Sequence, residues 1–132
     1  MSAEGIVLKD VEKLLKAAGD RARLRILALL DGGELCVCQL VAVLGLSQST
    51  VSKHLSVLEH AGLVENERRG KWMFYRLGRP AAGRARRLLP LLRCCGEDDP
   101  QIAEDQARAR GRKVRGLLAC CPPRGGGKRG RP

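Results

Sequence analysis

The spacing of apolar residues changes once along this chain, from the period of a helix to that of a strand. Leucine, valine and alanine first recur every three or four positions, which predicts amphipathic helices. Four such helices are expected, over 6–18, 21–30, 35–44 and 48–61. Two segments rich in β-forming residues follow, 63–67 and 72–77, joined by the basic turn 68–71. The order predicts a mainly helical fold with one small β-hairpin.

The second half of the chain is expected to add one more helix and then a basic extension. A fifth helix should reach Gly96, with a kink or an early end at Pro90. Residues 101–119 have a weaker helical pattern, and the last residues are too rich in glycine, proline and arginine to pack. We therefore predict a domain over 1–96 and a basic C-terminal extension over 97–132, partly helical and then disordered.

Positive charge dominates the composition and increases along the chain. The net charge is +11, and residues 79–132 carry 14 basic against 5 acidic side chains. This surplus favours a polyanionic partner, nucleic acid before an anionic membrane surface. No apolar run approaches the ~20 residues of a membrane span, and acidic residues stand where a signal peptide has its basic segment. We therefore expect a cytoplasmic protein without a membrane partner.

The third and fourth predicted helices are joined by Gly45-Leu46-Ser47, which is the spacing of a helix-turn-helix. Short polar side chains at the start of the second helix can approach the DNA major groove and read base edges. The basic turn of the hairpin can reach phosphates beside the groove, as a wing does. The residues expected to contact DNA are Gln48, Ser49, Thr50, Ser52, Lys53 and His54 on the helix, with Arg68, Arg69 and Lys71 on the wing.

Six cysteines form three tight pairs, at 36 and 38, at 94 and 95, and at 120 and 121. Neighbouring cysteines close almost no loop, so they make poor structural disulfides. In a reducing compartment such pairs suit soft metal or metalloid ions, or redox chemistry. On an ideal helix Cys36 and Cys38 lie about 200° apart. We therefore expect that one ion can bind both sulfurs only by unwinding that turn.

Four stretches together resemble the ArsR/SmtB family of winged-helix repressors. They are KAAGDRARLRILALL, ELCVCQL, LGLSQSTVSKHLSVLEHAGLV and RRGKWMFYRL, in the family's order and spacing. The resemblance implies a winged helix-turn-helix of order α-α-α-α-β-β-α. It also implies a homodimer joined through the first and fifth helices, and double-stranded operator DNA that is released when an ion binds.

ELCVC is similar to the signature of the arsenic-responsive branch, which implies that Cys36 and Cys38 are ligands of trivalent arsenic or antimony. The sequence departs from this branch at Val41, which replaces a third cysteine, and at Gln39, which replaces an aspartate. The third thiolate therefore stays open. Cys94 and Cys95 are candidates, either for this site or for a second one with Cys120 or Cys121.

Two other functions fit the same residues. The thiols can serve a repressor that senses oxidants or persulfides, or a protein that sequesters metalloid and binds nucleic acid without sequence preference. An enzyme is not expected, because no nucleophile–base pair or phosphate-binding loop appears in the sequence.

Overall fold

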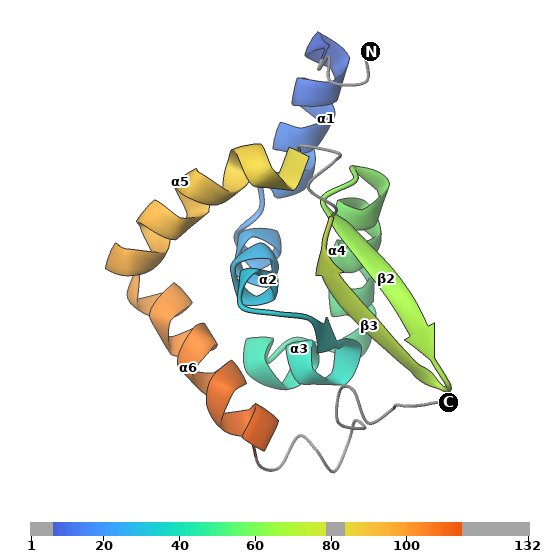
Figure 1. Ribbon diagram of the computed structural model, residues 1–132, viewed down its shortest axis with the longest axis vertical. Coiled ribbons are helices and arrows are strands. Elements are labelled where there is room, and N and C mark those ends of the chain that lie inside the picture. The colour runs from blue at the N-terminus through green and yellow to red at the C-terminus, as the bar shows by residue number, and fades with distance from the viewer. Residues whose placement is uncertain (1–6, 79–83, 115–132) are drawn as a thin grey trace.

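The computed structural model describes residues 7–78 and 84–114 and has a helical body with a small antiparallel sheet at one side (Figure 1). Its elements are α1 Leu8–Ala18, α2 Arg21–Asp31, β1 Leu35–Cys36, α3 Val37–Leu44, α4 Gln48–His60, β2 Val64–Arg69, β3 Trp72–Leu77, α5 Arg84–Asp98 and α6 Pro100–Val114. The predicted order of four helices, a hairpin and a fifth helix is confirmed. β1 is an addition, and α6 corresponds to the weaker helical pattern expected over 101–119.

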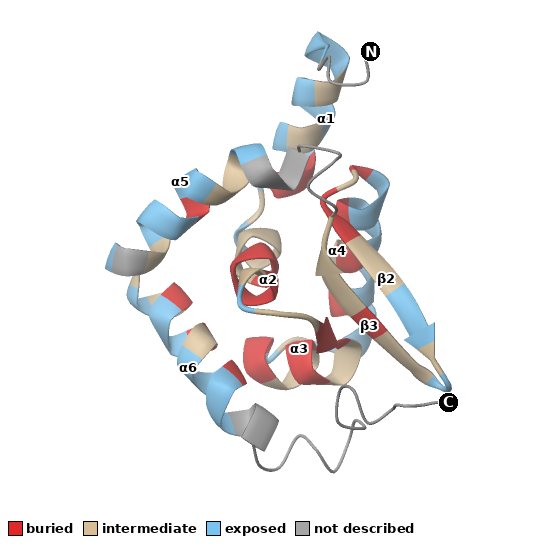
Figure 2. Ribbon diagram, in the orientation of Figure 1, coloured by how far each residue is buried: buried red, intermediate tan, exposed pale blue. Residues whose placement is uncertain are grey.

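The core lies where α2, α3 and α4 meet, and it is aliphatic (Figure 2). Leu35 of β1 and Val64 of β2 complete the core, and its other fully buried members lie on these helices or just before β2. They are Ile26, Leu27, Leu40, Val43, Val51, Leu55, Leu58 and Leu63. The opposite faces of α2 and α4 are polar, so burial of one apolar stripe orients each of them, whereas α3 is apolar on nearly every side.

Local signals set the ends of the two helices that form the helix-turn-helix. Gly45 ends α3 in the left-handed conformation at φ 74°, which is strained for residues with a side chain. Ser47 then caps α4, and its hydroxyl accepts the Thr50 N–H at 3.2 Å. The turn therefore has fixed geometry at both ends.

The two residues before α3 form a strand, which corrects the expectation of a helix over 35–44. Leu35 and Cys36 are extended, buried and paired antiparallel with β3, Leu35 opposite Tyr75 and Cys36 opposite Phe74. The segment is helical from Val37 onward, as its spacing predicts. Its first two residues instead form a strand, because they pair with β3. The resulting sheet has the order β1-β3-β2.

The hairpin is longer than expected, and its turn is shorter. β2 runs to Arg69, which pairs with Trp72 at the start of β3, so the turn consists of Gly70 and Lys71 rather than residues 68–71. Gly70 has φ 64°, as a tight hairpin turn requires. Both wing arginines therefore lie on a strand, where successive side chains point to opposite faces.

Residues 100–114 pack on the helical body. α5 continues through Pro90 to Asp98, two residues beyond its expected end at Gly96. α6 then turns back against α2 and α3, and buries Ile102 and Ala109 (Figure 1). The predicted boundary between 96 and 97 thus falls inside α5 and does not separate α6 from the core. The remainder of the predicted extension, with Cys120 and Cys121, lies outside the described residues.

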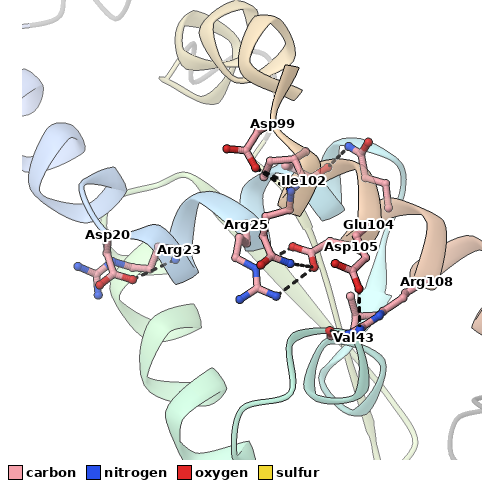
Figure 3. A network of polar contacts seen from close by, with 12 residues as sticks. Asp20, Arg23, Arg25, Val43, Asp99, Ile102, Glu104, Asp105 and Arg108 are labelled. Carbon is pink, nitrogen blue, oxygen red and sulfur yellow. Dashed lines mark hydrogen bonds and ion pairs between the residues drawn. The ribbon is translucent and has the colours of Figure 1, made fainter. Parts of the chain in front are cut away.

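A buried ion pair attaches α6 to α2 (Figure 3). Arg25 donates to both carboxylate oxygens of Asp105, at 2.7 and 3.0 Å, and Asp105 is 1% exposed. Gln101 donates a further hydrogen bond to the same carboxylate. The hydrogen bond from Arg25 to Asp105 raises the pKa of Arg25. Arg108 also reaches the Val43 carbonyl near the end of α3. α6 therefore contacts both α2 and α3, the helix that precedes the turn.

We expect Asp105→Ala to lower the free energy of unfolding by about 2–4 kcal/mol, because it leaves the Arg25 charge without its partner in a desolvated position. Urea unfolding followed by circular dichroism measures this loss. The double variant Arg25→Met, Asp105→Leu should recover most of it, because neither charge remains buried. Equal stability of Asp105→Ala and the wild type would contradict this role.

Candidate nucleic-acid interface and thiol site

The outward face of α4 carries the short polar residues that the sequence predicted for DNA contact. Gln48, Ser49, Ser52 and Lys53 are exposed, and the opposite face of the helix is buried (Figure 2). Thr50 is half-buried and accepts a hydrogen bond from the Ser47 hydroxyl at 2.9 Å. The first turn of α4 thus presents small, exposed hydrogen-bonding groups, as entry into a major groove requires.

His54 does not lie on that outward face. It is half-buried, and its Nδ1 accepts a hydrogen bond from the Arg23 guanidinium at 3.2 Å. Its Nε2 lies 3.9 Å from Asp20, the residue that caps α2. Since Arg23 can only donate, the neutral ring carries its proton on Nε2, toward Asp20. His54 therefore attaches the candidate recognition helix to α2.

The three basic residues of the wing have different surroundings. Arg68 and Lys71 are exposed near the hairpin tip. Arg69 points to the other face, where its guanidinium donates to both carboxylate oxygens of Glu34 at 2.6 and 3.0 Å, and to Glu67 at 3.0 Å. Strand alternation thus presents Arg68 to solvent and directs Arg69 toward β1. Sequence reasoning placed all three in one turn and missed this difference.

Cys36 and Cys38 are neighbours in space. Cys36 is the extended residue before α3, and Cys38 lies in the first turn of that helix. Their Sγ atoms are 3.0 Å apart. The expectation of sulfurs on opposite sides of a helix is therefore wrong, because Cys36 has strand geometry, φ −89° and ψ 166°. Two sulfurs at this spacing can hold one soft ion without unwinding α3.

The thiol pair lies at the base of the wing. Cys36 is 1% exposed and packs with the buried Phe74, and Cys38 and Trp72 border the same cluster. The Cys36 N–H donates to the side-chain oxygen of Gln39 at 2.9 Å. A capping residue with Gln three positions later is a recognisable helix-start signal. This spacing indicates the helix start correctly, and sequence reasoning had treated Gln39 only as a departure.

The cysteines of α5 lie apart from this pair. Cys94 and Cys95 are both exposed, and Cys95 lines a cavity of about 400 Å³ between α2, α5 and α6. Within residues 7–78 and 84–114, no three His, Cys, Asp or Glu side chains are grouped closely enough to hold a metal ion. Within a single chain, therefore, the described residues do not bring Cys94 or Cys95 into one metal site with Cys36 and Cys38.

An apolar stripe on α1 faces solvent. Leu8 is 84% exposed and Leu15 58%, with Val11 between them on the same face. Leu91 on α5 is likewise exposed. α1 projects from the body of the molecule, so this stripe has little of the chain to pack against (Figure 1). Among the described helices, none is long and apolar enough to cross a membrane.

The chain matches known proteins over the region that contains these features. Residues 20–66 match the family model described as bacterial regulatory protein, arsR family. The arsenical resistance operon repressor of Escherichia coli is 46% identical over 66 residues, which cover 49% of this chain and 56% of that protein. The biofilm growth-associated repressor of Agrobacterium fabrum is 38% identical over 90 residues, which cover 68% of this chain and 77% of that protein.

A solved structure shows the same architecture. It is the homodimeric winged helix-turn-helix DNA-binding domain of a possible ArsR-family regulator from Mycobacterium bovis, with a TM-score of 0.59 and 33% identity. The match covers 69% of this chain and 82% of that one. That domain is described as a winged helix-turn-helix, so the predicted winged helix-turn-helix fold is confirmed.

We expect His54→Ala to lower the free energy of unfolding by about 1–2 kcal/mol, because Arg23 and Asp20 lose a partner in a half-buried contact. Thermal or urea unfolding measures the change. Ser52→Ala, at an exposed position of the same helix, is the control and should stay within about 0.5 kcal/mol of the wild type. Unchanged stability of His54→Ala, together with weaker DNA binding, would instead assign this residue to the DNA contact.

Proposed function

This chain belongs to the ArsR family of bacterial regulatory proteins, and from that premise we propose that it is a homodimeric, cytoplasmic transcriptional repressor that binds operator DNA and releases it when trivalent arsenic or antimony binds Cys36 and Cys38. The observation that carries this proposal is the position of the sulfur pair. It lies at the start of α3, the helix immediately before the turn into α4. A ligand there acts on the helix that supports the DNA-contacting face.

DNA binding is proposed through α4 and the wing. The residues assigned to it are Gln48, Ser49, Thr50, Ser52 and Lys53 on α4, and Arg68 and Lys71 at the hairpin tip. The exposed amide and hydroxyl groups suit base edges, and the two basic side chains suit phosphates. In a dimer whose two α4 helices enter successive major grooves, the half-sites should lie about 34–36 Å apart.

A second copy of the chain is the proposed occupant of the apolar face of α1. The exposed leucines of α1 and Leu91 of α5 lie on the two helices through which the family resemblance implies dimerisation. The similar solved domain from Mycobacterium bovis is described as homodimeric. Burial of such side chains between two copies supplies roughly 1.5–3 kcal/mol for each one fully covered.

The chemistry of the sulfur pair suits a soft ion. Thiolates are the ligands that soft ions prefer, and the ion binds the deprotonated form. The N-terminus of α3 favours negative charge beside both sulfurs. An ion held there draws together the end of β1 and the first turn of α3. Coupling of about 1–3 kcal/mol between this site and DNA would weaken DNA binding roughly 5–150-fold.

Cys94 and Cys95 are proposed as ligands of a second site on α5 rather than as part of the first. The E. coli relative named for arsenical resistance supports a metalloid ligand for this chain in general, although the match spans little more than half of that protein's length. The sulfurs that hold the ion therefore have to be identified by experiments on this chain. Replacing each pair in turn and counting bound arsenic assigns them.

Thiol oxidation is a second candidate function, and the 3.0 Å separation of the sulfurs favours it. Two thiols at this distance can lose two hydrogens to a peroxide and form a disulfide; hydrogen peroxide is then reduced to two waters, and an organic peroxide to an alcohol and a water. The same junction between β1 and α3 would then respond to an oxidant. Release of DNA by peroxide without metalloid distinguishes this function from the first.

We expect the Cys36→Ser, Cys38→Ser variant to bind DNA as the wild type does and to lose release by arsenite. The probe is a duplex selected by the purified protein from a random-sequence library, and its Kd is measured with and without arsenite. The matched control, Cys94→Ser, Cys95→Ser, should keep at least fivefold release. Normal release from the Cys36/Cys38 variant contradicts the assignment, and failure to select any preferred sequence favours non-specific sequestration.

Lys71→Gln should weaken binding to the selected duplex and reduce the slope of log Kd against log salt by about 1, because one phosphate contact is lost. Arg93→Gln removes the same charge from α5, where Arg93 pairs with Asp31 at 2.8 Å, and should leave the slope unchanged. Equal slopes for Lys71→Gln and the wild type would remove the wing tip from the interface.

A further inference from the structure

The segment that carries the cysteines and the wing are joined by a closed ring of contacts. Glu34, two residues before Cys36, accepts both hydrogen bonds of the Arg69 guanidinium. That guanidinium also lies over the ring of Phe74, 4.5 Å from the centroid. Phe74 is the residue opposite Cys36 in the pairing of β1 with β3. A displacement of Cys36 can therefore be transmitted to the wing in two ways. One is the pairing of Cys36 with Phe74, and the other is the ion pair of Glu34 with Arg69.

The contacts of Arg69 are stronger than those of an ordinary surface ion pair. The pair with Glu34 is bidentate, and the Glu34 side chain is 16% exposed, so solvent screens it weakly. Burial of the Phe74 face beneath the cation adds a second attraction. Hydrogen bonds from Arg69 to Glu34 and then to Glu67 raise the pKa of Arg69 above its ordinary value. Arg69 is thus held by Glu34 just before β1, by Glu67 of β2 and by Phe74 of β3.

Arg69 lies next to the hairpin turn, so the contacts that fix Arg69 also restrict the position of the hairpin tip. Gly70 and Lys71 follow it directly, and Arg68 precedes it on the opposite face. The two-residue turn leaves no slack between Arg69 and the exposed basic residues. The orientation of Arg68 and Lys71 therefore depends on where Glu34 and Phe74 hold Arg69.

We propose that Glu34 and Arg69 are positioning residues that couple the thiol pair to the wing, holding the tip in its DNA-binding orientation when the pair is unoccupied. The inference rests on the proposed function, since it assigns the route by which the thiol site acts. An ion on Cys36 and Cys38 shifts β1, in which Cys36 faces Phe74, and with it Glu34, the residue directly before the strand. Arg69 then loses its fixed position, and the wing leaves the phosphates.

A positioning role and a purely electrostatic role predict opposite effects of changing the charge at Glu34. Glu34→Gln removes a negative charge near the DNA-binding face, so electrostatics alone predicts tighter binding. Loss of the positioning contact predicts the opposite. Arg69→Lys keeps the positive charge but loses the bidentate geometry and the flat stacking on Phe74. A direct phosphate contact by Arg69 would tolerate lysine, whereas the positioning role would not.

The experiment compares full-length wild type, Glu34→Gln, Arg69→Lys and the control Arg76→Gln. Arg76 lies on the same hairpin and shares Glu67 with Arg69, but its ion pairs are with Glu65 and Glu67 and not with Glu34, so Arg76→Gln disturbs the hairpin without removing the link to β1. Arsenite binding is followed by the fluorescence of Trp72, the single tryptophan of the chain, which borders the thiol pair. The Kd for the selected duplex is measured with and without arsenite, and circular dichroism verifies folding.

We expect Glu34→Gln and Arg69→Lys to weaken binding to the selected duplex at least fivefold without arsenite, and to reduce the effect of arsenite on that Kd to below about twofold. Their affinity for arsenite should stay within about threefold of the wild type, and Arg76→Gln should keep the wild-type ratio. Tighter or unchanged duplex binding by Glu34→Gln, or a wild-type ratio in both variants, overturns the coupling.

A second measurement separates failure of this inference from failure of the proposed function. If arsenite leaves the wild-type Kd unchanged, the proposed metalloid response is wrong. The coupling is then judged by hydrogen exchange at the amides of 68–72 in Cys36→Ser, Arg69→Lys and the double variant, without DNA or ion. Coupled sites give non-additive changes in exchange, whereas additive changes overturn the coupling.

Discussion

The pairing of Leu35 and Cys36 with β3 is the contact on which the functional parts of the molecule depend. It is two residues long, yet it joins the helix-turn-helix to the hairpin and gives Cys36 its extended backbone. Because Cys36 is extended, its sulfur turns toward that of Cys38. Because its strand partner is Phe74, the thiol pair lies against the base of the wing. One short strand thus places the candidate sensor beside the DNA-binding hairpin.

This arrangement changes how a ligand on the sulfurs would act. A pair on opposite sides of a helix would require local unfolding, and the free energy of binding would have to offset lost helical hydrogen bonds. A pair already 3.0 Å apart at a strand–helix junction needs a small shift instead. Buried, close-packed neighbours such as Phe74 transmit small shifts because they have little room to absorb them.

Much of the fold could be read from periodicity and capping. The ends of α2, α3 and α4 follow from Asp20, Gly45 and Ser47, whose effects are local. The features that were missed all depend on a distant partner. β1 needs β3, the orientation of Arg69 needs Glu34, and α6 is anchored by Asp105 through Arg25, 80 residues earlier. No spacing within a short segment predicts such pairs.

The sequence by itself determined the order of helices and hairpin, the helix-turn-helix, the basic character and the close spacing of the thiols, because each depends on neighbours within a few residues. The tertiary structure alone decided which of these groups face solvent and which face one another. It turned His54 toward Arg23 and Arg69 toward Glu34, and left Lys53, Arg68 and Lys71 exposed. The physical reason is that side-chain direction follows from helix phase and strand register, and both are set by long-range packing of the core.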